Sequence, residues 1–228
     1  MQFRFDVFIQ NIFRLLFFVK ETMFIATVSF TCGMAIALLL AVIDKYKIPV
    51  FFRLSKIFIS FFRSTPMLCQ LFFFYFGISP SIPLLRDASA MVSLLIIMSM
   101  NESAFMAETL RGALSSVDKG QREAALSLGM TEWQALKRIV IPQAIRVAIP
   151  GLSNSFISLI KGSSLGFTIG VVEILSKSKL LAASNFRFME AYLAALLVYW
   201  ALIWLLGYAQ KHLETRANKG VVDVHFNH

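Results

Sequence analysis

Residues 115–144 read SSVDKGQREAALSLGMTEWQALKRIVIPQA, and they form a polar segment with clear helix start and stop signals in an otherwise apolar sequence. Asp118 is followed three residues later by Gln121, a spacing that resembles a capping box and predicts the start of a short helix. Gly129 is suited to end that helix, because glycine adopts the left-handed conformation without steric cost. The segment therefore begins with a short, well-delimited helix.

A second helix is predicted directly after the first one. Thr131 with Gln134 repeats the capping-box pattern. Pro142 is expected to stop this helix, because proline lacks the backbone N–H and clashes with the preceding turn. The segment is too polar to cross a bilayer, so we expect helix, glycine turn and helix on one membrane face. Taken alone, an interfacial helix that packs on its own bundle would also fit this pattern.

The composition around this segment is that of a membrane protein. Of the 228 residues, 57% are hydrophobic and only 15% are charged, whereas soluble domains average about 45–50% apolar and about 25% charged residues. Together with a mean hydropathy of +0.71, this excludes a disordered chain and a disulfide-stapled secreted domain. Cys32 and Cys69 lie within apolar runs and are interpreted as small hydrophobic residues.

Five transmembrane helices are predicted, which makes the fold all-α and membrane-integral. The uncharged run Thr22–Ile43 has 22 residues and would reach about 33 Å, enough for the hydrocarbon core. The other spans are expected at about Ile57–Gly77, Ala88–Ala107, Pro142–Ile160 and Ala191–Gln210. The domain boundaries that follow are 1–20 (an amphipathic interfacial helix), 21–213 (the five-helix unit with its polar loop at 115–142) and 214–228 (a polar, flexible tail).

The distribution of basic residues predicts the orientation. Segments 44–63, 109–146 and 210–228 carry fourteen Lys and Arg residues, and the segments on the opposite side carry eight. Basic residues collect in cytoplasmic loops, so the N-terminus is expected outside and the C-terminus in the cytoplasm. The net charge of +9 is explained in the same way, by membrane topology and contact with lipid headgroups, and does not indicate nucleic-acid binding.

Charged and polar residues inside the predicted spans are candidates for a substrate pathway. Ionisable side chains are costly in a bilayer and mark functional positions by default. Glu102 is the clearest case, because its carboxylate would suit an ammonium group of a substrate. Lys161 could contact a substrate carboxylate or reach the interface. Arg63 could anchor at the headgroups or reach the pathway together with Thr65 and Gln70.

Pro150 and Gly151 are expected to interrupt the fourth span near the membrane midplane. Broken helices often line substrate sites, so Asn154 and Ser155, one turn later, could bond a substrate. The alternative is a kink that only improves packing. The run GSSLGFTIG (162–170) holds two overlapping G-x-x-x-G patterns, which allow close helix contact either within one chain or between subunits.

These residues resemble a known family, the permease subunits of ATP-binding-cassette importers. The segment GQREAALSLGMTEWQALKRIVIPQA (120–144) is similar to their cytoplasmic EAA loop, in which Glu-Ala-Ala is followed by Gly and then by Leu/Ile-Pro. The matching residues here are Glu123, Ala124, Ala125, Gly129 and Pro142. Segments 61–77, 107–121, 148–165 and 190–200 resemble the polar amino-acid branch, with the cystine-type members most similar. Ser64, Phe105 and Gly162 depart from the family's usual residues.

The resemblance implies a function and a set of partners. It implies a type I importer permease bundle in a bacterial plasma membrane that moves a polar amino acid, such as L-cystine, inward. It implies partner ATPase subunits that use ATP and Mg, a second permease copy or paralogue, and an extracellular or periplasmic solute-binding protein. It assigns ATPase coupling to Gly120, Gln121, Glu123, Ala124, Ala125 and Gly129.

The sequence offers no sign of an enzyme. No G-x-x-x-x-G-K-[ST] phosphate loop occurs, so ATP hydrolysis is expected in a separate polypeptide. No catalytic constellation, metal-ligand spacing or cofactor motif is present. The alternative function is an ion-gradient secondary carrier or a channel subunit without an ATPase partner. Such a protein would also have buried charges, but it would not need a capped cytoplasmic helix.

Overall fold

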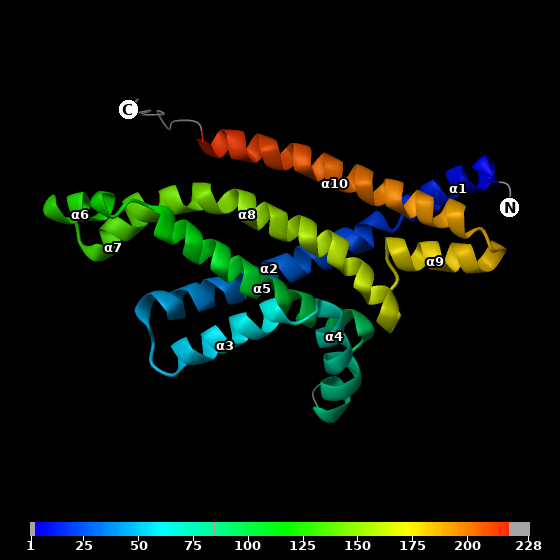
Figure 1. The fold of residues 1–228 in the computed structure, drawn as a ribbon, viewed down its shortest axis with the longest axis horizontal. Coiled ribbons are helices and arrows are strands. Elements are labelled where there is room, and N and C mark those ends of the chain that lie inside the picture. The colour runs from blue at the N-terminus through cyan, green and yellow to red at the C-terminus, as the bar shows by residue number, and fades with distance from the viewer. Residues whose placement is uncertain (1–2, 84, 219–228) are drawn as a thin grey trace.

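The structure, a computed structural model, describes residues 3–83 and 85–218, and this part of the chain is helical with no strand (Figure 1). The longer helices are α1 (Phe5–Leu16), α2 (Val19–Tyr46), α3 (Phe51–Ser64), α5 (Ala90–Ser116), α8 (Ile141–Gly162), α9 (Ile174–Asn185) and α10 (Phe188–Asn218). The shorter ones are α4 (Met67–Phe72), α6 (Lys119–Ser127) and α7 (Glu132–Ala135), the π-helical segments η1 (Phe73–Ile78) and η3 (Leu136–Val140), and the 3₁₀ segments η2 (Ser79–Ser81) and η4 (Ser163–Ile169). The predicted all-α class is confirmed.

The helices account for the predicted number of membrane spans. Three helical stretches are long and apolar enough to cross a bilayer: α1 with α2, α5, and α10 up to His212. Two bent pairs raise the number to five when each is taken as one span, namely α3 with α4–η2 and the α7–η4 helix with α9. The second, third, fourth and fifth predicted spans thus correspond to α3–α4, α5, α8 and α10.

The core lies where α2, α5 and α8 pack together. Its buried residues include Ile25 from α2, Leu94 and Met98 from α5, and Ile160 from α8. Helices α2 and α5 share the most extensive contact in the described chain. Gly33 permits this approach, since a Cβ atom there would lie 2.8 Å from Cε of Met106 and 3.0 Å from the Ser99 carbonyl oxygen.

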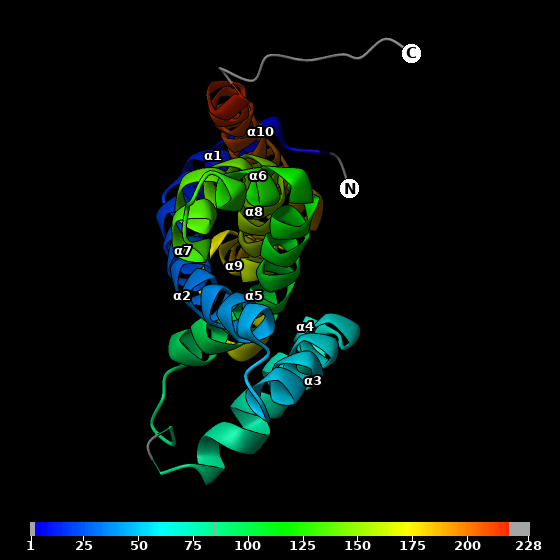
Figure 2. The same ribbon diagram turned by 90° about the vertical axis from the view of Figure 1, so that its left-hand side faces the viewer.

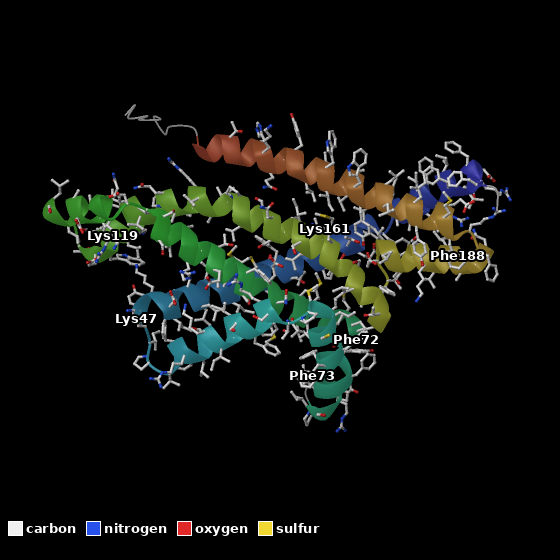
Figure 3. All side chains as sticks on the ribbon, viewed as in Figure 1. Lys47, Phe72, Phe73, Lys119, Lys161 and Phe188 are labelled. Carbon is white, nitrogen blue, oxygen red and sulfur yellow. The ribbon has the colours of Figure 1, made fainter. Side chains whose placement is uncertain are left out.

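The elements sort to two ends of an elongated bundle. In Figure 1, α6, α7 and the turn between α2 and α3 lie at the left end, and the C-terminal end of α10 points toward them. Helices α1 and α9 and the start of α10 lie at the right end, and Figure 3 labels Phe188 there and Lys47 at the opposite end. Figure 2 shows α3 and α4 to one side of the other helices.

Helix α1 packs on the protein through one face. Phe8, Asn11 and Leu15 are buried, and Phe8 and Leu15 join an apolar cluster formed with α9 and α10. Phe5 and Phe13, on the other side, are 66% and 63% exposed. The helix predicted at 1–20 is thus present over Phe5–Leu16, and its location in the membrane interface stays a prediction.

The second predicted span is not one helix from Ile57 to Gly77. Helix α3 ends at Ser64, and α4 leaves it at an angle of 111°. Pro66 causes this break, because the residue before a proline is disfavoured in the helical region, and Thr65 has extended angles (φ −115°, ψ 145°). The chain after the break therefore projects sideways from the bundle (Figure 2).

Two expected proline effects are wrong. Pro142 does not stop the second loop helix, because α7, η3 and α8 run on as one helical stretch. The π-helical turn η3 comes just before Pro142 and resets the hydrogen bonding, so that proline lies in the first turn of α8, where its N–H is not needed. Pro150–Gly151 does not interrupt α8 either, which is helical throughout Ile141–Gly162.

Several helices are longer than predicted. Helix α5 continues nine residues beyond Ala107, to Ser116. The stretch between the fourth and fifth predicted spans contains η4 and the whole of α9, which packs on α10 and α1. Helix α10 continues to Asn218, so the tail predicted from residue 214 begins as helix. The remainder of that tail, 219–228, lies outside the described residues.

Candidate functional site

The polar loop folds as its local signals predict. The carboxylate of Asp118 accepts a hydrogen bond from the Gly120 N–H at 2.6 Å and caps α6. Gly129 ends the helix with a φ of +83°, a conformation that strains residues other than glycine. Thr131 and Gln134 form both hydrogen bonds of a capping box, at 3.2 Å and 2.9 Å. The predicted helix, glycine turn and helix is confirmed.

Most of the residues to which coupling was assigned lie on the open surface of this loop. One does not: Ala125 is only 4% exposed and is the buried residue of α6. Leu128 is 82% exposed, an unusual position for a large apolar side chain in a polar loop. Sequence reasoning did not assign it a role, although its place one turn after Ala124 could have indicated one. The exposed coupling candidates are Gly120, Gln121, Glu123, Ala124 and Gly129.

An ion pair fixes α6 against the helix that follows it. The guanidinium group of Arg122 forms two hydrogen bonds with the Glu132 carboxylate, one of 3.0 Å from Nε and a shorter one from an Nη atom. This pair bridges the glycine turn and joins α6 to α7. Because α7 runs on through η3 into α8, α6 is connected mechanically to a membrane-spanning helix.

The second candidate site is a cavity of about 790 Å³. It lies between the end of α3, the middle of α5 and the second half of α8 with η4. Two of its charged residues, Arg63 and Lys161, come from different helices, and Figure 3 labels Lys161 near the end of α8. Of the seven pathway candidates, six line it: Arg63, Thr65, Glu102, Asn154, Ser155 and Lys161.

Glu102 is the most enclosed charged group of this cavity. It is 7% exposed, and Ser155 on α8 lines the same cavity from the other side of the α5–α8 contact. Gly151, one turn before Ser155, brings the two helices together, because a Cβ atom there would lie 2.5 Å from Cγ2 of Thr109. Gly151 thus serves the close packing of α8 on α5, and α8 stays helical through Pro150.

Polar side chains continue along the cavity face of α8. Asn154, Ser158 and Lys161 are spaced by four and three residues, so they share one side of the helix. All three are exposed in the single chain although α8 lies in a predicted membrane span. Backbone and side-chain polar groups at membrane depth are tolerated only where protein or water covers them. This face therefore does not contact lipid tails.

An ionic cluster lies at the rim of the cavity nearest the polar loop. The Arg111 guanidinium bonds the Glu108 carboxylate with distances of 2.5–3.2 Å, the i,i+3 pair expected from their spacing. Arg63 approaches the same carboxylate at 3.8 Å and lies over the Phe105 ring, 5.7 Å from its centre. Arg63 thus reaches the cavity and keeps its charge paired.

Gln70 does not line the cavity; it holds the α3–α4 break together. Its side-chain amide donates to the Thr65 hydroxyl at 2.7 Å, to the Thr65 carbonyl at 3.1 Å and to the Phe62 carbonyl at 3.2 Å. The Asn101 amide on α5 donates to the Gln70 side-chain oxygen at 2.9 Å and to the Phe62 carbonyl at 3.1 Å. Asn101 was missed, although it directly precedes Glu102 within an apolar span.

The glycine patterns serve contacts within the chain. A Cβ atom on Gly162 would lie 2.9 Å from Met67, and one on Gly166 would lie 2.7 Å from Leu94. Residues 163–169 form a 3₁₀ helix rather than an α-helix, and Gly170 has a φ of +87°. Of the two readings left open, close packing inside one chain is the one that Gly162 and Gly166 display.

Comparisons with known proteins give a consistent family assignment. The family described as binding-protein-dependent transport system inner membrane component matches residues 33–219. The Probable amino-acid ABC transporter permease protein PatM of Vibrio harveyi is 41% identical and covers 97% of this chain and 100% of its own length. The L-cystine transport system permease protein TcyL of Bacillus subtilis is 37% identical, with 86% of each chain covered.

A solved structure agrees with these relatives. The permease-like chain in the structure described as an amino acid ABC transporter with histidines superimposes with a TM-score of 0.87 at 26% identity. The superposition covers 95% of this chain and 100% of that one.

Proposed function

Because this chain belongs to the family of binding-protein-dependent transport system inner membrane components and is a membrane-integral permease subunit of an amino-acid ABC importer, we propose a route and a substrate for it. Its cargo is a polar amino acid of the cystine type. The cargo passes inward through the cavity between α3, α5 and α8, and ATPase subunits acting on α6 drive the movement. The chain is a transport subunit and not an enzyme.

The observation that carries the substrate proposal is the charge pattern of the cavity. Glu102 supplies an enclosed carboxylate on α5, and Lys161 and Arg63 supply cations from α8 and α3. An amino acid carries an ammonium and a carboxylate group, so groups of both signs in one cavity suit it. Asn154 and Ser155 add neutral hydrogen-bonding groups between them. The amino-acid names of its relatives support the class of cargo, and TcyL supports cystine in particular.

The coupling proposal rests on the exposed side of α6. Members of this family work with ATPase subunits and binding proteins. An exposed leucine beside small and acidic side chains is an apolar anchor with room for close approach, as Leu128, Ala124 and Glu123 provide. We assign ATPase docking to this surface and, through the Arg122–Glu132 pair, transmission to α8.

The proposed orientation rests on the elements at the α6–α7 end of the bundle. The C-terminal end of α10 points toward the α6–α7 end (Figure 1), and the basic segments 44–63 and 109–146 belong to that end. We therefore place α6 and the C-terminus in the cytoplasm and the N-terminus outside. The opposite end, with α9, is the side for the solute-binding protein, and α1 lies in the outer interface.

A second permease chain completes the pathway in this proposal. The face of α8 that bears Asn154, Ser158 and Lys161 is exposed in the single chain, and exposed polar groups do not survive against lipid tails. A second copy or a paralogue that packs over this face would enclose the cavity between the two subunits and keep it wet.

Replacement of Glu102 by Gln tests the substrate site. The change keeps the shape of the side chain but removes its charge, so we expect the half-saturating cystine concentration for uptake to rise about tenfold or more, as loss of a charge-assisted bond would require. Radiolabelled uptake by cells carrying the complete transporter measures it.

The matched control is Glu21→Gln, which alters a carboxylate in the first turn of α2 that does not line the cavity. We expect it to leave the half-saturating concentration unchanged. Unaltered affinity and substrate range in Glu102→Gln would remove Glu102 from the site.

A further inference from the structure

A second, apolar cavity lies beside the polar loop. It has a volume of about 370 Å³ and is walled by the ends of α2 and α5, by α7–η3 and by the start of α8. Most of its lining residues are aliphatic, such as Val42, Leu110 and Ile145, and two are aromatic, Tyr46 and Trp133. The substrate pathway uses none of these residues.

The apolar cavity adjoins a charged one. A neighbouring cavity of about 310 Å³ shares Lys45 and the side chains of Ala41, Leu114 and Leu136 with it. The charged groups of the neighbour are mostly paired: Arg111 with Glu108, Arg122 with Glu132, and Asp44 with Lys56 at 2.7 Å. Together the two cavities offer an apolar compartment and a polar compartment that meet at one lysine.

Lys45 is the cation at that junction. Among the described residues, no ion pair includes it; its Nζ atom lies 5.6 Å from the centre of the Tyr46 ring. A ligand with an anionic group at one end of an apolar chain would fit here, with its anionic group at Lys45.

The two aromatic residues indicate where this groove lies relative to the membrane surface. Tyr46 and Trp133 are 60% and 61% exposed, and such rings concentrate at the boundary between hydrocarbon and headgroups. Tyr46 is the last residue of α2 and Trp133 belongs to α7, and Figure 1 shows the turn after α2 and α7 at the same end of the bundle. The groove thus opens at the headgroup level, where lipid is the most abundant amphiphile.

We propose that these joined cavities bind an anionic phospholipid, with an acyl chain in the apolar part and the phosphate group at Lys45. The apolar wall matches a hydrocarbon chain, and the unpaired cation at its polar end matches a headgroup of net negative charge. The bound lipid contacts α2 on one side and α7 on the other, so it stabilises the seat of the polar loop on the membrane-spanning helices. The proposal needs only membrane insertion and not the transport function.

Quenching of tryptophan fluorescence by lipids with brominated acyl chains tests it. The chain has three tryptophans, so Trp200→Phe with Trp204→Phe leaves Trp133 as the reporter at the groove. The full-length chain is placed in vesicles of phosphatidylcholine that contain increasing fractions of brominated phosphatidylglycerol or brominated phosphatidylcholine. We expect phosphatidylglycerol to be preferred about fivefold at Trp133, the factor that one lysine near an anionic headgroup supplies.

Substitutions at two neighbouring lysines distinguish a lipid bound in the groove from a general attraction of anionic lipids to basic residues. Lys45→Gln should bring the preference at Trp133 close to one. Lys47→Gln, an exposed cation in the same turn that does not line either cavity, should leave it unchanged. The proposal is overturned if Trp133 shows no preference in the unaltered groove, if Lys47→Gln lowers the preference as much as Lys45→Gln, or if Trp133 is quenched by neither lipid, which would mean that protein covers the groove.

Discussion

Ala124→Trp should reduce ATP-driven uptake about 30-fold or more while the permease still inserts in the membrane. Ala124 is exposed on α6, so a large side chain there does not disturb the fold of the chain itself. It would hold a docked ATPase subunit away from Glu123 and Leu128. Loss of an interface contact worth about 2 kcal/mol or more corresponds to this factor. Glu123→Lys should act in the same direction through charge reversal.

Uptake and ATP hydrolysis measured together in proteoliposomes distinguish this effect from misfolding. We expect transport to fall and hydrolysis to lose its dependence on the binding protein. Ala124→Ser, which adds a single hydroxyl at the same position, is the matched control and should keep most of the uptake. Ala125→Trp is not equivalent, because Ala125 is buried and its replacement would disrupt the packing of α6. Full coupling in Ala124→Trp would contradict the docking surface.

The second large effect concerns stability: Gln70→Leu should lower the free energy of unfolding by about 2–4 kcal/mol. The change removes the donor for the Thr65 carbonyl and the acceptor for Asn101 at the α3–α4 break. A buried polar group left without a partner costs about 1–3 kcal/mol, and this change removes several hydrogen bonds at once. Because Arg63 and Thr65 adjoin the break, uptake should also decline.

Unfolding of the purified chain in mixed detergent micelles measures this difference. Gln143→Leu is the matched control, since among the described residues the Gln143 amide bonds to the Ile139 carbonyl of the preceding turn alone, at 3.1 Å. It should change the free energy of unfolding by less than about 0.5 kcal/mol. If Gln70→Leu proved no more destabilising than Gln143→Leu, the break would be held by Pro66 alone.

Local sequence signals predicted the polar loop correctly. The caps at Asp118 and Thr131 and the turn at Gly129 depend on residues only two or three positions apart. Such bonds form wherever the segment is placed, so no knowledge of the rest of the chain is needed. The apolar runs likewise predicted the spans, because burial in a bilayer demands a minimum length.

Long-range packing explains what the sequence did not reveal. Proline signals at 142 and 150 were misinterpreted, because a π-helical turn precedes Pro142 and α8 stays helical through Pro150. The 111° turn at Pro66 depends on Gln70 and on Asn101 from another helix. Helix α9 escaped prediction since its basic residues, Lys177 and Lys179, lie over the rings of Phe18 and Phe167 rather than in a loop.

Some of the cavity residues could be predicted from the sequence and others could not. A carboxylate within an apolar span stands out in the sequence, so Glu102 was found, as were the polar residues near it on α8. Gln70 was placed on the pathway because residue type does not reveal direction, and its amide turns toward the backbone of α3 instead. Leu128 was missed as a possible anchor because exposure of an apolar side chain becomes visible only in three dimensions.

Uptake of radiolabelled cystine into proteoliposomes that contain this chain, its ATPase subunits and the binding protein tests the central claim most directly. We predict accumulation that requires ATP and Mg on the side where α6 lies, that requires the binding protein on the other side, and that persists when ion gradients are collapsed. Accumulation driven by a proton or sodium gradient in vesicles without ATPase subunits would contradict it and would indicate a secondary carrier.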